Sequence, residues 1–303
     1  MISILYVIAA FGGGAFAAAI GGTQAFIFTG IFSIAGGAAA MAGATEASGV
    51  LLNYFAFGPF FGPHIAFAAG AAASAYAKKK GLMENGADCA YQTWSFNEPS
   101  VLIVAGIFGV IGCLVKELVM ANLFAGTISP RLVTDLPGIT VFLSGILARL
   151  LFGGKLRTGT EYLSKGKALA TTILIGITFS IITGGFYVAA VAADVPVEAF
   201  GGNYHVICFG IAAIGLTFAV LGQPFFGCHH ILIIAAEAVV QCYNTTGNLY
   251  LALVVSVVFG TISALLCDFE TKWINSGTDS HIDGPAFAIL IMTFVVNACF
   301  PVL

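Results

Sequence analysis

A six-residue segment occurs twice in the sequence and carries a histidine at the same place each time. Residues 59–64 read Pro-Phe-Phe-Gly-Pro-His, and residues 224–229 read Pro-Phe-Phe-Gly-Cys-His. Proline and glycine interrupt a helix and leave the first backbone N–H groups of the next helix without partners. These groups could bind a small anion or carboxylate, and a histidine beside them could carry a proton or donate to an anionic substrate. We therefore expect His64, His229 and His230 to bind substrate at these two breaks. The alternative is a tight surface loop whose aromatic side chains lie at the membrane interface.

Acidic residues inside apolar segments form a second group of candidates. Glu46 is expected near the middle of one such segment, and Glu237 stands seven residues after His230, on the same predicted helix face. A carboxylate in hydrocarbon is costly unless it is paired, protonated or hydrated, so such residues usually line a cavity. We predict that Glu46 and Glu237 bind a coupling H⁺ or Na⁺. The alternative is a protonated carboxyl that bonds to the backbone of a neighbouring helix.

Two aspartates have the same spacing from a proline. Asp135 and Asp283 each stand two residues before one, at Pro137 and Pro285. This spacing is an ordinary helix start, with aspartate as N-cap and proline in the first turn. A carboxylate at this place would also suit ion coupling, and both interpretations stay open.

The remaining substrate candidates are amide or aromatic side chains beside glycine pairs or within the two breaks. They are Gln24, Gln223, Phe61 and Phe226. We expect no metal site at Cys228, His229 and His230, because adjacent side chains on a helix diverge by about 100°. No phosphate loop, nucleophile triad or zinc-protease motif occurs in the sequence. We therefore predict no catalytic residue, no enzyme activity and no cofactor apart from a coupling Na⁺ or H⁺.

The composition places these residues in a membrane. Hydrophobic residues make up 59 % of the 303 residues, charged residues make up 8 %, and the mean hydropathy is +1.01. A soluble domain keeps about a quarter of its residues charged. This chain cannot cover its surface for water, which excludes a soluble enzyme, a disordered chain and a nucleic-acid-binding protein. The predicted partners are a lipid bilayer and a small-molecule or ion substrate.

Apolar segments of helix length predict an all-α protein with about ten transmembrane helices. These spans are residues 3–32, 37–57, 63–78, 98–120, 136–153, 167–193, 204–222, 228–243, 248–267 and 283–301. With the N-terminus outside, nine of the 11 lysine and arginine residues fall on the cytoplasmic side, and Lys116 and Arg131 fall outside. The positive-inside rule therefore places both termini outside, in a plasma or inner membrane.

Further matches between the two halves of the chain indicate an internal duplication. The Pro-Phe-Phe-Gly matches have an offset of 165 residues, and the Asp-x-Pro matches have an offset of 148. The predicted repeats are residues 1–153, with a cytoplasmic loop at 79–97, and residues 167–303, joined by a cytoplasmic linker at 154–166. Five spans per copy is an odd number, so the second copy enters the membrane from the opposite side. This inverted topology is typical of secondary transporters and some channels.

The sequence therefore predicts a secondary transporter for a small monovalent or neutral solute. Access would alternate between the two sides, with coupling to H⁺ or Na⁺. Few basic residues lie inside the spans, which disfavours a multiply charged anion. One alternative is a passive channel or facilitator for a small solute or ion on the same fold, and a second is a membrane subunit of a larger complex. Helix faces rich in glycine and alanine could also pair into a homo-oligomer.

Overall fold

The protein is all-helical. The computed structural model describes residues 2–125, 129, 132–196 and 201–300. Helices account for 76 % of the chain, and the described residues contain no strand. Six helices are long and apolar enough to cross a membrane, which supports a membrane location. Arg131, one of the two basic residues expected on the outer side, lies outside the described ranges.

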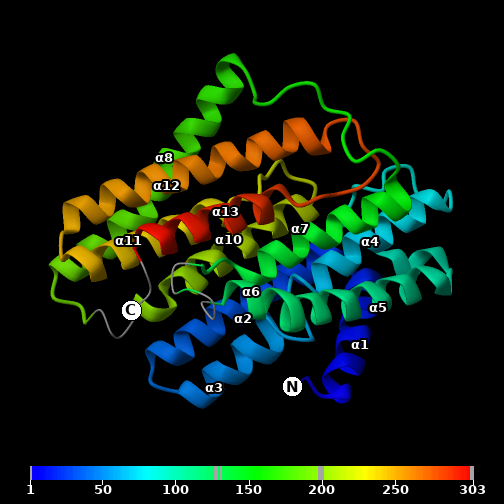
Figure 1. Ribbon diagram of the computed structural model, residues 1–303, viewed down its shortest axis with the longest axis horizontal. Coiled ribbons are helices and arrows are strands. Elements are labelled where there is room, and N and C mark those ends of the chain that lie inside the picture. The colour runs from blue at the N-terminus through cyan, green and yellow to red at the C-terminus, as the bar shows by residue number, and fades with distance from the viewer. Residues whose placement is uncertain (1, 126–128, 130–131, 197–200, 301–303) are drawn as a thin grey trace.

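Several helices continue into a short helical segment of another type (Figure 1). The first half contains α1 (Ile4–Ile20), α2 (Gly22–Met41), α3 (Thr45–Val50) with η1 (Leu51–Ala56), α4 (Ala66–Lys79), η2 (Thr93–Phe96), α5 (Pro99–Leu114) with η3 (Val115–Met120) and α6 (Ala121–Phe124), and α7 (Leu136–Ala148) with η4 (Arg149–Gly153). The second half contains α8 (Gly166–Ala192), η5 (Gly201–Asn203), α10 (Tyr204–Val220), α11 (His229–Thr246), α12 (Leu249–Glu270) with η6 (Thr271–Asn275), and α13 (Gly284–Cys299).

The first two predicted spans are wrong. The expected helix at residues 3–32 is two helices that meet at Gly21, whose φ of +100° suits glycine. Because α2 continues to Met41, the expected span at 37–57 is replaced by α3 and η1, which have six residues each. The sequence is apolar on both sides of Gly21, so hydropathy alone gives no sign of the turn.

Both predicted helix breaks are confirmed. The chain is not helical between η1 and α4, which includes Pro59 to Gly62, nor between α10 and α11, which includes Pro224 to Gly227. Thr29, near the middle of α2, donates a hydrogen bond to the carbonyl oxygen of Phe61 at 2.6 Å. Phe226 packs on Phe179, near the middle of α8, with 6.0 Å between the ring centroids. Both breaks therefore lie level with the middles of neighbouring helices.

The helices of each half pack in a corresponding way. In the first half α1 packs on α4 and α5, and α4 also packs on α5 and α7. In the second half α8 packs on α11 and α12, and α11 also packs on α12 and α13. The halves meet where α2 contacts α10 and where α7 contacts α13.

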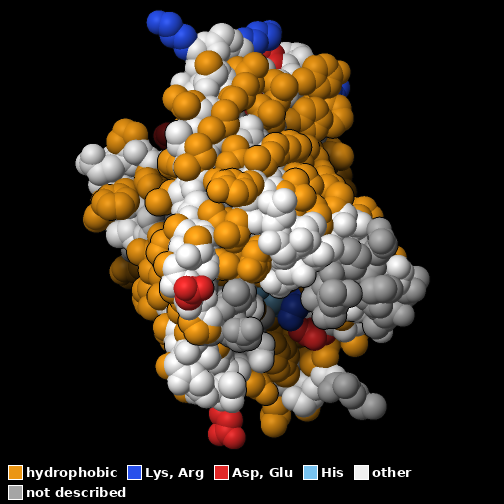
Figure 2. Space-filling model, turned by 90° about the vertical axis from the view of Figure 1, so that its left-hand side faces the viewer, with side chains coloured by type: hydrophobic (Ala, Val, Ile, Leu, Met, Phe, Trp, Pro, Cys, Tyr) orange, Lys and Arg blue, Asp and Glu red, His pale blue; other side chains and the backbone are white. Residues whose placement is uncertain are grey.

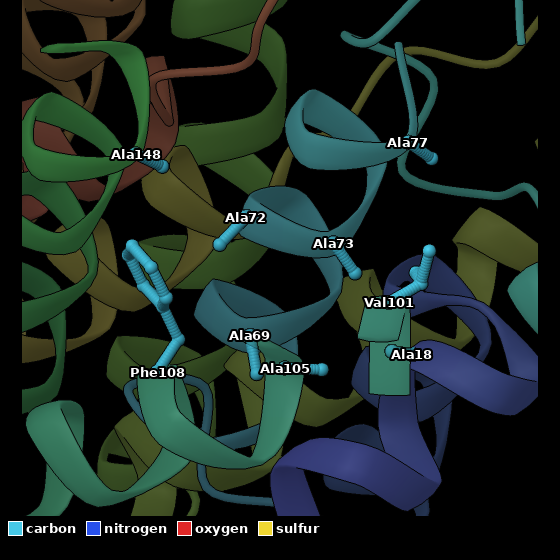
Figure 3. Packing of buried hydrophobic residues seen from close by; sticks show 9 residues of the cluster. All are labelled: Ala18, Ala69, Ala72, Ala73, Ala77, Val101, Ala105, Phe108 and Ala148. Carbon is cyan, nitrogen blue, oxygen red and sulfur yellow. The ribbon is translucent and has the colours of Figure 1, made fainter. Parts of the chain in front are cut away.

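Small side chains allow the helices of the first half to approach closely. The buried cluster between α1, α4, α5 and α7 is mostly alanine, including Ala18, Ala69 and Ala105, with Phe108 as its one large side chain (Figure 3). A Cβ atom added at Gly109 would lie 3.1 Å from the Cα of Gly14 across the α1–α5 contact. Such contacts are typical of helices packed within a membrane, where close van der Waals packing drives association.

Large hydrophobic side chains cover much of the outer surface. Leu5, Phe186, Tyr250 and Val254 are among those more than half exposed. Figure 2 shows one face, on which hydrophobic side chains predominate and lysine or arginine side chains stand at the upper end. The same face has a hollow that contains histidine, basic and acidic side chains. An apolar surface of this extent suits contact with lipid.

Candidate functional site

A cavity of about 230 Å³ lies between α2, α4, α7, α10, α11 and α13, and we call it the central cavity. Its polar lining includes four residues that the sequence singled out, Asp135, His229, Glu237 and Asp283. The phenyl rings of Phe26, Phe57, Phe67 and Phe209 also line it, together with His205. The fold thus gathers candidates from both halves around one small space.

The two aspartates cap helices that cross at their first turns. Asp135 accepts a hydrogen bond from the backbone N–H of Gly138, and Asp283 accepts one from that of Ala286 at 2.7 Å. A Cβ atom added at Gly138 would lie 3.5 Å from the carbonyl oxygen of Ala286. Both aspartates are therefore N-caps, as the ordinary interpretation predicted, and both also line the central cavity.

Helices α7 and α13 run antiparallel from this crossing (Figure 1). Gly145, farther along α7, lies against Ile282, which precedes α13, whereas Thr134, before α7, donates a hydrogen bond to the carbonyl oxygen of Leu290. The positive ends of both helix dipoles therefore lie beside the central cavity. Each carries an aspartate that offsets this positive end.

A network around a buried arginine fixes the loop before α13. Arg149 is fully buried and donates hydrogen bonds to Ser280 Oγ at 2.8 Å, Ser280 O at 2.7 Å and Asn275 Oδ1 at 2.5 Å. Asn275 in turn donates to Glu270 Oε2 at 2.7 Å and accepts from the N–H of Ile282 at 3.0 Å. We call these residues the Arg149 clamp. The clamp ends immediately before Asp283 and so helps to position this aspartate beside the cavity.

Glu237 separates the central cavity from a second space of about 390 Å³, which we call the Glu237 chamber. The Thr293 hydroxyl donates a hydrogen bond to the Glu237 carboxylate at 2.8 Å. Polar residues of this chamber include Thr134, Asp135, His205, Gln241, Asn244 and Asn297. Because Asp135, His205 and Glu237 line both spaces, the chamber and the cavity adjoin.

A third space of about 310 Å³, the Asp88 chamber, adjoins the central cavity on the opposite side of His229 and Asp283. It is lined by residues 87–90 and by His281, whose ring nitrogen lies 3.1 Å from Asp283. The three spaces therefore form a series along the bundle. Among the described residues that line it, four are acidic and none is lysine or arginine.

The three predicted histidines have different positions. His229 lines the cavity, and its ring lies 4.8 Å from that of Phe26. His64 and His230 are fully buried away from it. Gly112 contacts the carbonyl oxygen of His64, and Ser263 donates to that of His230 at 2.9 Å. Ser263 stands 151 residues after Gly112, and Leu253 of α12 stands 151 residues after Leu102 of α5. By these contacts His230, and not the motif residue His229, takes the place of His64.

The prediction that Glu46 lies within a span is wrong. Glu46 is exposed in the first turn of α3, because the chain turns after Met41. The other substrate candidates also lie away from the central cavity. Gln24 donates to the carbonyl oxygen of Ala90 at 2.8 Å, Gln223 is exposed, Phe61 stacks on Phe28, and Phe226 packs on Phe179.

The structure adds polar residues that the sequence did not indicate. His205, Thr293 and Asn297 stand in apolar segments without a repeated motif. Asn297 stands 148 residues after Arg149, the same offset that relates Asp283 to Asp135. This offset was the one signal that could have drawn attention to it.

The chain belongs to a family of unknown function (DUF7973), whose family model matches residues 1–164 and 171–302. No curated protein and no solved structure matches the chain.

Proposed function

We propose that this protein is a secondary membrane transporter for a small neutral or monovalent solute, coupled to Na⁺ or H⁺. The observation that carries the proposal is the series of three adjoining spaces, with Asp135, Glu237 and Asp283 around the central one. Ionisable residues within a membrane are costly and usually mark a solute, ion or proton path. The cavity volume of about 230 Å³ suits a small solute.

The arrangement of the halves supports an inverted repeat. Helices α1, α2, α4, α5 and α7 correspond in their packing to α8, α10, α11, α12 and α13. Helices α2 and α10 run antiparallel, because Gly30 lies against Ala213 whereas Gly37 lies against Ile207. The α7–α13 contact is antiparallel as well. Two antiparallel contacts between corresponding helices are those expected for halves of opposite orientation.

The family match supports the same division. Between its two segments the match leaves out residues 165–170, which overlap the end of the predicted linker at 154–166. Each segment contains five corresponding helices, and α3 with η1 is an addition to the first. In this arrangement both termini would lie on the outer side, as the distribution of lysine and arginine favours.

The charge of the lining indicates which solutes fit. Carboxylates occur in all three spaces, and none of the described residues that line them is lysine or arginine. This environment repels anions and accepts cations or neutral molecules. The four phenyl rings of the central cavity would contact the apolar part of a solute, while His229 and His205 would offer hydrogen bonds.

Uptake into proteoliposomes tests the proposal. The experiment imposes Na⁺ or pH gradients and compares a panel of neutral and cationic solutes in the wild type and Glu237→Gln. We expect accumulation against the solute gradient in the wild type and its loss in the variant. Glu46→Gln is the matched control, because this exposed carboxylate lies outside the three spaces.

A passive channel is the second candidate, because three spaces in series could also conduct. Flux that follows only the solute gradient and persists in Glu237→Gln would indicate the channel and exclude coupled transport. Absence of flux for every solute and ion tested, with a protein that unfolds cooperatively, would exclude both.

A further inference from the structure

The side-chain oxygen of Asn297 is buried without a hydrogen-bond partner. Asn297 is 2 % exposed, and its Oδ1 has no hydrogen-bond donor among the residues that the structure describes. The amide orientation is fixed because Nδ2 donates to the carbonyl oxygen of Thr293 at 2.8 Å, a bond that only the nitrogen can make. A buried polar atom without a partner is costly, and Asn297 lines the Glu237 chamber. Asn297 therefore brings an oxygen without a donor to the wall of this chamber, where it is a candidate ligand atom.

The other polar atoms around the chamber are mainly oxygens. The Thr293 hydroxyl uses its hydrogen to bond Glu237, which leaves its lone pairs free to contact a ligand. The Oε1 atom of Gln241 is also buried without a partner. Asp135 adds a carboxylate, and one of its oxygens caps α7. Carboxylate, hydroxyl and amide oxygens are the ligands that hard cations prefer.

The corresponding position in the first half already holds a cation. Arg149 stands 148 residues before Asn297, the offset that relates the caps of α7 and α13. Its guanidinium is fully buried and linked to Glu270 through Asn275. In the second half the side chain is a neutral amide, and about 390 Å³ of space lies beside it. The two halves therefore differ by one buried positive charge.

We propose that the Glu237 chamber binds Na⁺ through Asn297 Oδ1, Thr293 Oγ1 and the Glu237 carboxylate. Of the two carboxylates that line the chamber, Asp135 caps α7 and Glu237 caps no helix. A single carboxylate of this kind suits a monovalent ion. The described residues contain no group of three or more His, Cys, Asp or Glu side chains that could hold a metal ion, which disfavours a transition metal. Only the role of this ion in coupling rests on the proposed function, whereas binding itself does not.

Thermal unfolding of the detergent-purified protein tests the site without transport. The protein is titrated with NaCl at constant ionic strength, with choline chloride as the replacement salt, and KCl and CaCl₂ are compared. We expect a saturable rise in Tm with Na⁺ alone, because a ligand that binds only the folded state stabilises it. In Asn297→Ala and Thr293→Val we expect the apparent Na⁺ affinity to fall at least about tenfold.

Two further variants serve as a control outside the chamber and as a test of ion preference. Gln223→Ala removes an exposed amide outside the chamber and should retain the wild-type response. Asn297→Asp keeps an oxygen ligand and adds a negative charge, so it should respond to Ca²⁺. Equal stabilisation by Na⁺ and K⁺, a response to Ca²⁺ alone in the wild type, or an unchanged Na⁺ response in Asn297→Ala would each overturn the site.

The Tm response to Na⁺, compared with uptake into proteoliposomes, distinguishes the Na⁺ site from the proposed transport function. Saturable Na⁺ binding without solute accumulation under any gradient would support the site and reject the transporter. Accumulation driven by a pH gradient, without a Tm response to Na⁺, would reject the site and support the transporter.

Discussion

Gly30 of α2 and Gly210 of α10 lie against each other where the two halves of the chain meet. A Cβ atom added at Gly30 would lie 2.8 Å from the carbonyl oxygen of Gly210, and one added at Gly210 would lie 2.7 Å from that of Gly30. Both distances are too short for a methyl group. The two helices therefore touch through backbone atoms, and any side chain at either position would push the halves apart.

Substitution at this crossing should destabilise the protein. We expect Gly30→Ala and Gly210→Ala each to lower the free energy of unfolding by about 1–3 kcal/mol, because the obstructing atoms are backbone atoms that cannot rotate away. Denaturation in mixed micelles would measure the change. Gly185→Ala is the control, since a Cβ there would meet nothing within 4 Å. An equal loss in the control would show that helix flexibility, and not contact, sets the requirement for glycine.

The Arg149 clamp should be essential for stability. We expect Arg149→Met to lower the free energy of unfolding by about 3–5 kcal/mol, because it leaves Glu270 buried without its nearby cation. Arg149→Lys should not restore stability, since one ammonium cannot reproduce the bonds of the guanidinium. Arg157→Gln is the control, because Arg157 is exposed and stacks on the ring of Trp273, at 5.0 Å. A fully stable Arg149→Met variant would refute this role.

The adjacent histidines should respond differently to substitution. His229→Asn alters the lining of the central cavity. We expect uptake to fall about tenfold, which corresponds to the loss of one hydrogen bond to the solute. We expect little change in Tm. His230→Ala removes a fully buried ring, so we expect a loss of stability of about 1–3 kcal/mol. Uptake and thermal unfolding of both variants would test this contrast. The reverse pattern would place His230, and not His229, in the path.

Acid should weaken the start of α5. Hydrogen bonds from Ser100 and Lys80 lower the pKa of Glu98 below its usual value of 4.5. A lowered pKa in the folded state contributes stability above the unfolded pKa, and this contribution is lost as the pH falls through the folded value. We expect the Tm difference between the wild type and Glu98→Gln to shrink as the pH is lowered from 7 to 3. A difference independent of pH would show that the carboxylate charge contributes nothing.

Local sequence patterns predicted the parts of the site that local geometry determines. The two Pro-Phe-Phe-Gly breaks and the two Asp-x-Pro caps follow from residues a few positions apart, and the structure contains all four. The predicted position of Glu46 within a span is wrong because the chain turns at Gly21, inside an apolar segment. That turn shifts α2 toward the C-terminus and carries Glu46 out to an exposed helix end.

Long-range contacts could not be predicted in the same way. In the sequence Arg149 marks only the predicted cytoplasmic side, yet in the structure it bonds to residues more than 100 positions away. Asn297 and Thr293 lie in an apolar helix, and only the packing of α13 on α11 brings Thr293 to Glu237. A buried polar partnership of this kind depends on which helices touch, and a single sequence does not contain this information.

With Na⁺ bound in the Glu237 chamber, the difference between Arg149 and Asn297 would also make the two ends of the bundle unequal toward the surrounding solution. At one end the positive charge is part of the chain and is present at any salt concentration. At the other end, if Na⁺ fills the chamber, the charge comes from the water on that side. The protein would then sense the ionic composition of only one of the two compartments that the membrane separates.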